Sequence, residues 1–196
     1  MDVQAETELW TEFLSGNRTA FSQLYDRYAD VLFSFGLRYS SDRDLVKDCI
    51  HDLFIDLHHY RAGLAREVNI RFYLLKSLRR KLEQAHRKSA LFRHETWENE
   101  SVLAISPFSF SIEDEIITDE SQKELLQSLA EEVNRLPERQ REILYLRFRH
   151  DFDYEQIASL MQISVPTCRT FIYRALKQLR GKLELLTLLF LLFLVE

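Results

Sequence analysis

Apolar residues recur at helical spacing along most of this chain, and residues that break helices are few. In the first half such stripes run through residues 18–39, 42–60 and 69–88. Only 4 Gly and 3 Pro occur in 196 residues, which leaves little room for the tight turns of a β fold. The pattern therefore predicts an all-α protein.

Short polar residues stand where the first two of these helices should begin. Asn17 can cap the first, and Ser41 with Asp44 resembles a capping box for the second. The second helix pairs an apolar stripe with an acidic face, whereas the third carries a basic face. Two neighbouring helices of opposite charge suggest two different partners.

Helical periodicity is lost from about Phe92 to Thr118, where the segment SPFSFSIEDE mixes serine, proline, phenylalanine and acids. We interpret this stretch as a flexible acidic linker that joins two small helical domains. The expected boundaries are a domain at 1–92, a linker at 93–118, a second domain at 119–184 and an apolar tail at 185–196.

Near the C-terminus the pattern predicts a short helix, a brief turn and a longer helix. Asp153 and Gln156 form a capping-box-like start for the short helix, and Ser164 can cap the long one, with Pro166 in its first turn. Ala158 is small where the two helices must approach closely. These are the ingredients of a DNA-binding helix-turn-helix.

The long helix divides into an apolar arc and a polar one at 100° per residue. From Gln162 to Lys182 there are five basic residues and no acidic ones. Arginine, threonine and lysine suit base edges and phosphates. The predicted DNA-binding residues of this recognition helix are Pro166, Thr167, Arg169, Thr170, Tyr173, Arg174 and Lys177.

The segment LPERQREILYLRFRHDFDYEQIASLMQISVPTCRTFIYRALKQLR resembles the fourth-region domain of bacterial sigma factors, which reads the −35 promoter element. The resemblance rests on Leu136-Pro137, Arg141-Glu142, the run from Tyr154 to Ala158, and the run from Tyr173 to Leu176. It implies that residues 119–184 form that domain. Phe171 stands where many relatives carry arginine. Recognition of the −35 element can therefore depend on another DNA-bound factor that recruits this protein.

The first half is similar to the second-region domain of the same family. DCIHDLFIDL resembles the helix that binds the polymerase clamp, with His51 in place of the usual glutamine. Its acidic face suits a positively charged groove. The resemblance implies that the core-polymerase-binding residues are Asp48, His51, Asp52, Phe54 and Asp56.

NIRFYLLKSLRRKLEQAHRK resembles the helix that melts and reads the −10 element. Basic side chains can hold a strand by its phosphates, and an aromatic ring can stack on an unpaired base. The predicted −10 and melting residues are Asn69, Arg71, Tyr73, Lys76, Arg79, Arg80, His86 and Arg87.

With two such domains and no third-region domain, the chain resembles extracytoplasmic-function sigma factors. That resemblance implies promoter recognition, DNA melting and transcription initiation, with the clamp and flap of core RNA polymerase, promoter DNA and an anti-sigma factor as partners. Charge agrees with this, because residues 61–94 hold 10 basic and 2 acidic residues, a net charge of +8. Residues 95–134 hold 1 basic and 11 acidic residues, a net charge of −10, suited to a basic channel.

The remaining chemistry gives no sign of an enzyme. We find no catalytic constellation, metal-ligand spacing or phosphate loop, and we expect no cofactor and no small-molecule substrate. The two cysteines, Cys49 and Cys168, lie far apart on apolar stripes, as expected of buried thiols in a reducing cytosol. The N-terminus lacks the features of a signal peptide, so a cytoplasmic protein is expected.

Two other interpretations stay open. A two-domain helix-turn-helix regulator could bind an operator without being a polymerase subunit. The apolar tail LELLTLLFLLFLV is too short to span a membrane, but it could extend the last helix, contact a partner, rest on a membrane surface as an adaptor would, or be disordered.

Overall fold

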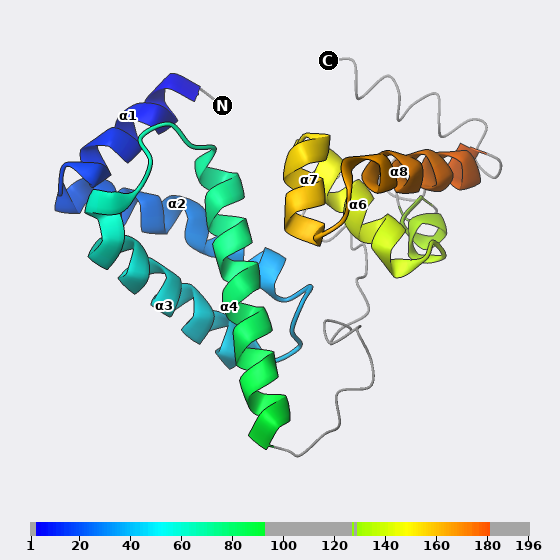
Figure 1. The fold of residues 1–196 in the computed structure, drawn as a ribbon, viewed down its shortest axis with the longest axis horizontal. Coiled ribbons are helices and arrows are strands. Elements are labelled where there is room, and N and C mark those ends of the chain that lie inside the picture. Colours follow the sequence, from blue (N-terminus) through cyan, green and yellow to red (C-terminus); the bar gives the residue numbers. More distant parts are fainter. Residues whose placement is uncertain (1–2, 93–126, 128, 181–196) are drawn as a thin grey trace. The chain divides into compact units, whose positions relative to one another are not determined.

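The computed structural model describes residues 3–92, 127 and 129–180. All regular structure in these ranges is helical, which confirms the all-α prediction. The helices fall into two compact units, one before and one after the expected linker (Figure 1). The predicted linker and apolar tail lie outside the described residues, so the domain boundaries at 92, 118 and 184 stay predictions.

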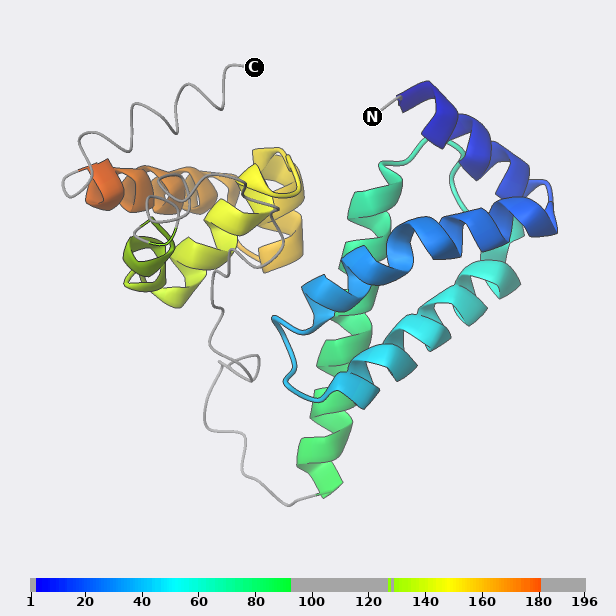
Figure 2. The ribbon, with the colours of Figure 1, turned by 180° about the vertical axis from the view of Figure 1, so that it is seen from behind.

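The first unit consists of four α-helices and one 3-10 turn: α1 (Val3–Leu14), α2 (Arg18–Gly36), α3 (Arg43–Tyr60), η1 (Arg61–Gly63) and α4 (Ile70–Phe92). Helices α2 and α3 lie side by side and both contact α4, while α1 packs on α2 and on η1 (Figure 2). Their apolar stripes meet in one core. Its most deeply buried large side chains include Trp10, Phe13, Leu24, Leu32, Phe35, Leu74, Leu75, Leu78 and Leu82.

The helix starts of this unit follow from local hydrogen bonds. Asn17 caps α2 as predicted, and its side chain accepts from the backbone amides of Thr19 and Ala20. The cap of α3 is Asp42, which accepts from the amides of Asp44 and Leu45, so the expected Ser41–Asp44 capping box is wrong by one residue. Serine and aspartate side chains both have an oxygen that can accept these hydrogen bonds, and the backbone conformation determines which residue caps the helix.

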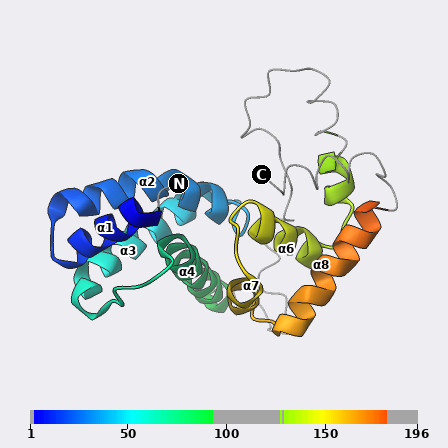
Figure 3. The ribbon, with the colours of Figure 1, turned by 90° about the horizontal axis from the view of Figure 1, so that it is seen from above.

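The second unit consists of α6 (Glu138–Phe148), α7 (Tyr154–Met161) and α8 (Val165–Arg180), preceded by helical residues at 129–134. Each of the three named helices contacts the other two, as the view in Figure 3 illustrates. Its core contains Leu136, Ile143, Leu146, Phe152, Ile157, Leu160, Cys168, Ile172, Ala175 and Leu179. No helix within the described ranges is long and apolar enough to cross a membrane.

Candidate nucleic-acid interface

Helices α7 and α8 form a helix-turn-helix whose two starts are both capped. The Asp153 side chain accepts from the amide of Gln156 at 2.7 Å, and the Gln156 side chain accepts from the amide of Asp153 at 3.1 Å. This confirms the predicted capping box. Ser164 caps α8, because its hydroxyl accepts from the amide of Thr167 at 3.2 Å.

The turn between the two helices depends on one left-handed residue. Gln162 follows the end of α7 with φ of 56° and ψ of 43°, and its amide donates to the carbonyl of Ala158. The amide of Ile163 donates to the same carbonyl at 3.0 Å. This closure satisfies the end of α7 and reverses the chain over a short distance, so that α8 can pack back on α7.

Helix α8 is buried on one face and exposed on the other, as its sequence predicts. Cys168, Ile172, Ala175 and Leu179 are buried against the rest of the unit. Phe171 is partly buried. Of the predicted DNA-binding residues, Thr167 is half-buried, whereas the exposed ones are Pro166, Arg169, Thr170, Tyr173, Arg174 and Lys177.

Local contacts hold parts of this exposed face in place. The Thr170 hydroxyl donates to the carbonyl of Pro166 at 2.9 Å, and the Thr167 and Ser164 hydroxyls share a hydrogen bond of 2.8 Å. Tyr173 is the most exposed aromatic here, with 65% of its surface accessible. A face of this kind can offer cations, hydroxyls and one aromatic ring to a nucleic acid.

Charged side chains surround the start of α8. The guanidinium carbon of Arg169 lies 5.3 Å from the ring centre of Tyr154, and that of Arg147 lies 5.7 Å from the same centre. Burial raises the pKa of the Cys168 thiol, and Glu155 acts in the same direction, while Arg147 and Arg169 lower it. A buried thiol with a raised pKa stays protonated and packs as an apolar group.

Basic side chains of α4 have different environments, although the sequence groups them together. Arg80 and Arg87 are exposed, and Arg71, Lys76 and His86 are half-buried. The Lys76 ammonium lies 5.5 Å from the ring centre of Phe72. The exposed and half-buried basic residues can reach a phosphate.

Arg79 departs from that prediction. Its side chain is only 8% exposed, and its Nε lies 3.1 Å from Oε1 of Glu83, which is 10% exposed. Its guanidinium also lies 4.9 Å from the ring centre of Tyr39. The geometry contradicts a DNA-contacting role for Arg79, because the group is committed to a buried ion pair inside the unit.

Two other residues near the start of α4 are tied to the fold. The side chain of Asn69 accepts from the amide of Phe72 at 2.9 Å and so caps α4. The half-buried ring of Tyr73 meets the ring of Trp10 edge to face, with 6.0 Å between centres. Both side chains can still present polar atoms to solvent, but each also stabilises the fold of the first unit.

The acidic face of α3 is accessible apart from one predicted residue. Asp48, His51 and Asp52 are exposed. Asp56 is exposed and accepts from Lys81 of α4 at 2.6 Å. Phe54 is only 3% exposed and packs against Tyr25 with 4.8 Å between ring centres, so the structure contradicts a direct contact between Phe54 and a partner.

The helix-turn-helix lies within a stretch that matches a known family. Residues 126–179 match the model of the family described as Sigma-70, region 4. The match includes α6, α7 and all seven predicted residues of the recognition helix. The second unit is therefore similar to region 4 of sigma-70 proteins.

Solved structures extend the likeness to the fold of the first half. The structure of CnrH in complex with the cytosolic domain of CnrY is similar over 92% of this chain and 97% of its own chain, at 19% identity and a TM-score of 0.54. The sigma factor RpoE from Bartonella quintana, in complex with the anti-sigma factor NepR, covers 84% and 97%, at 21% identity and a TM-score of 0.55. Among curated proteins, no sequence matches this chain. At these identities the likeness shows that the chain shares the fold of these proteins.

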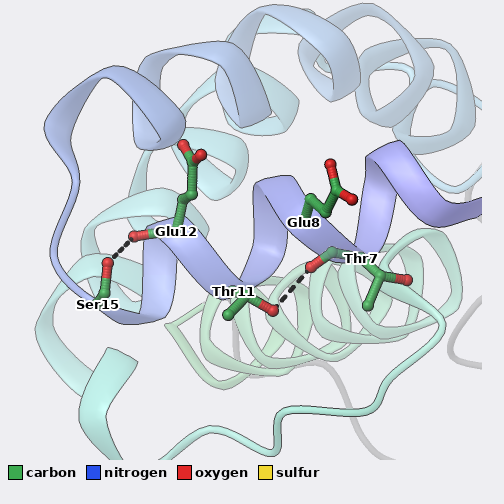
Figure 4. A pocket seen from close by; sticks show the side chains of 5 residues that line it. All are labelled: Thr7, Glu8, Thr11, Glu12 and Ser15. Atoms are coloured by element: carbon green, nitrogen blue, oxygen red, sulfur yellow. Dashed lines mark hydrogen bonds between the residues drawn. The ribbon is translucent and has the colours of Figure 1, made fainter.

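Outside these surfaces the first unit has a shallow depression along α1, lined by Thr7, Glu8, Thr11, Glu12 and Ser15 (Figure 4). Two of its hydroxyls are bonded to the backbone of α1 itself: Thr11 donates to the Thr7 carbonyl and Ser15 to the Glu12 carbonyl. All lining residues come from one helical stretch, so the depression has no converging groups. In the described ranges, no group of three or more His, Cys, Asp or Glu side chains could hold a metal ion.

Sequence reasoning missed two residues beside the recognition helix, Tyr154 and Arg147. Tyr154 directly follows the cap of α7, and Arg147 lies in the last turn of α6. The sequence did carry a signal, because an aromatic residue between two arginine-bearing helices invites stacking. Only the packing of three helices reveals that the three side chains meet.

Proposed function

We propose that this chain is a sigma factor that binds core RNA polymerase and directs promoter recognition, DNA melting and transcription initiation. The observation that carries the proposal is the exposed face of α8, where cationic and hydroxyl side chains lie opposite a fully buried face. A helix of this kind, held by a capped partner helix, fits the major groove. Its contacts would be made with the −35 element.

On α8, Arg174 and Lys177 are suited to close contacts, since both are exposed on the second half of the helix, with Lys177 in its last turn. Arginine can donate two hydrogen bonds to guanine, and lysine neutralises a phosphate. Thr170 and Tyr173 add a hydroxyl and a ring on the same face.

In the first unit we assign −10 recognition and melting to the accessible part of the predicted set, with Arg79 removed. Arg80 and Arg87 would neutralise phosphates of the separated strands, and Arg71, Lys76 and His86 would add shorter-range contacts. Asn69 and Tyr73 lie at the start of the same helix and would meet an unpaired base.

The acidic face of α3 would bind core polymerase through Asp48, His51 and Asp52, with Asp56 beside them. Exposed carboxylates favour a basic groove on the partner. Because the two similar structures described above are complexes, one of them with an anti-sigma factor, we also propose an anti-sigma factor as a regulatory partner.

The test is transcription in vitro with the purified chain, core RNA polymerase and a promoter library. Initiation at a discrete set of promoters, absent with core enzyme alone, is the expected result. A doubly substituted variant, R174A with K177A, should lose initiation at promoters that depend on a −35 element. R139A removes one exposed charge on α6 of the same unit and serves as the control.

Other outcomes separate the alternatives. Specific DNA binding without polymerase, and no initiation with it, would support the operator-binding regulator instead. Initiation that appears only when a second DNA-bound factor is added would support recruitment and agree with the partly buried Phe171. Initiation from random sequence, unaffected by the double substitution, would contradict the role of α8.

A further inference from the structure

Three helices of the second unit meet at the ring of Tyr154. Tyr154 is the first residue of α7, Arg147 comes from the last turn of α6, and Arg169 comes from the second turn of α8. Both guanidinium groups lie within cation–π distance of the ring, at 5.7 Å and 5.3 Å. The recognition helix is therefore joined to its neighbours through a polar contact as well as through the core.

The backbone at Tyr154 and the side chain of Arg147 are both held by other hydrogen bonds. Tyr154 follows the capping box of Asp153 and Gln156, which sets the backbone at the start of α7. Arg147 donates to the carbonyl of Phe152 at 2.9 Å and lies 3.9 Å from a carboxylate oxygen of Asp151. The charge of Arg147 is thus balanced locally, whereas Arg169 is exposed on the face of α8.

Two acidic residues flank Tyr154 in the sequence. Glu155 is adjacent to Tyr154 and exposed, and Asp153 is also exposed. An arginine with a long flexible stem could turn toward either carboxylate and lose its free charge. Stacking on a flat ring limits the guanidinium to fewer positions and leaves its N–H groups open in the plane.

We propose that Tyr154 is a positioning residue that holds the Arg169 guanidinium ready for a backbone phosphate of promoter DNA. The ligand is a phosphodiester, which two parallel N–H groups of arginine can bind. Preorganisation of this kind improves binding because less freedom is lost when the contact forms. The inference rests on the proposed function of the helix-turn-helix and adds to it a residue outside the recognition helix.

The experiment measures the affinity of the full chain, bound to core RNA polymerase, for a fluorescein-labelled promoter duplex over a range of salt concentrations. Loss of one phosphate contact lowers the slope of log affinity against log salt by about 1. We expect that loss for R169A and most of it for Y154L. Y154F keeps the ring and should keep the slope of the unmodified protein.

Two further variants separate positioning from simple destabilisation. Y154L combined with R169A should bind no more weakly than R169A alone, because both changes remove the same contact. E155Q added to Y154L should restore part of the slope if Glu155 captures the released guanidinium. A partly unfolded variant would instead lower the active concentration and leave the slope unchanged.

A Y154L protein with the unmodified salt slope would overturn the inference, and so would a Y154F protein that loses as much as Y154L. If the losses of Y154L and R169A add, the two residues act independently and positioning is also excluded. An unmodified complex that binds the promoter no better than core polymerase alone would overturn the proposed function together with this inference.

Discussion

The indole nitrogen of Trp10 donates a hydrogen bond of 3.0 Å to the backbone carbonyl of Ala65, 55 positions further along the chain. Trp10 is only 1% exposed and its ring also contacts those of Phe13 and Tyr73. The segment around Ala65 joins α3 to α4 and has few buried side chains of its own. Helix α1 therefore anchors the connection that leads into the basic helix α4.

Replacing Trp10 by phenylalanine should loosen this connection. The lost hydrogen bond is expected to lower the free energy of unfolding by about 0.5–1.5 kcal/mol, and the smaller ring adds a void. Urea denaturation followed by far-UV circular dichroism measures the loss, and trypsin should cleave faster after Arg66. T11A changes an exposed residue of the same helix and should match the parent, whereas equal cleavage of W10F would show that the bond does not hold the segment.

Gly36 is the last residue of α2 and faces Val46 of α3. A Cβ added there would lie 2.5 Å from Cγ1 of Val46, a fully buried side chain. Glycine to alanine in a helix usually stabilises by about 0.5–1 kcal/mol. Here we expect G36A to destabilise by about 1–3 kcal/mol, because the core must move to accept the methyl group.

The cause can be isolated with a double-mutant cycle. G36A with V46A should cost at least about 1 kcal/mol less than the sum of the single changes, since V46A removes the clashing methyl groups. G63A is the control, because a Cβ at Gly63 would meet nothing within 4 Å. Additive losses in thermal or urea unfolding would exclude the contact as the reason for glycine.

Alanine substitution of the adjacent residues Arg79 and Arg80 on α4 should have different effects on stability and on promoter melting. R79A leaves Glu83 buried without its cation and is expected to lower the free energy of unfolding by about 3–5 kcal/mol. R80A changes an exposed side chain, should alter stability by less than about 0.5 kcal/mol, and should weaken promoter melting. Urea unfolding and permanganate footprinting of the open complex measure the two effects. A stable R79A protein with a melting defect would restore Arg79 to the DNA-binding set.

Features that depend on neighbours in sequence were predictable. The two arcs of α8, the Asp153–Gln156 capping box and the Asn17 cap each involve residues within a few positions, so spacing alone defines them. The helix-turn-helix and the exposed face of α8 could therefore be predicted from the sequence with few errors.

Features that depend on distant contacts were not predictable. The ring of Tyr39 that receives Arg79 lies 40 positions away, so nothing in the pattern of α4 distinguished Arg79 from Arg80. Helix α1 is held by the Trp10–Ala65 bond and was not predicted at all. Phe54 fits a motif, yet its place on the apolar stripe of α3 puts it in the core.

The capping box of α7 supports the whole recognition unit, because it sets the start of the helix on which α8 packs. D153A removes the acceptor for the Gln156 amide and is expected to cost about 0.5–2 kcal/mol of unfolding free energy. D153N keeps an acceptor oxygen at the same place and should cost less. Urea unfolding of the two variants provides the comparison, with E131A, which changes an exposed carboxylate elsewhere in the same unit, as the charge control. If D153N loses as much as D153A, the negative charge near the N-terminus of α7 stabilises the helix more than the hydrogen bond does.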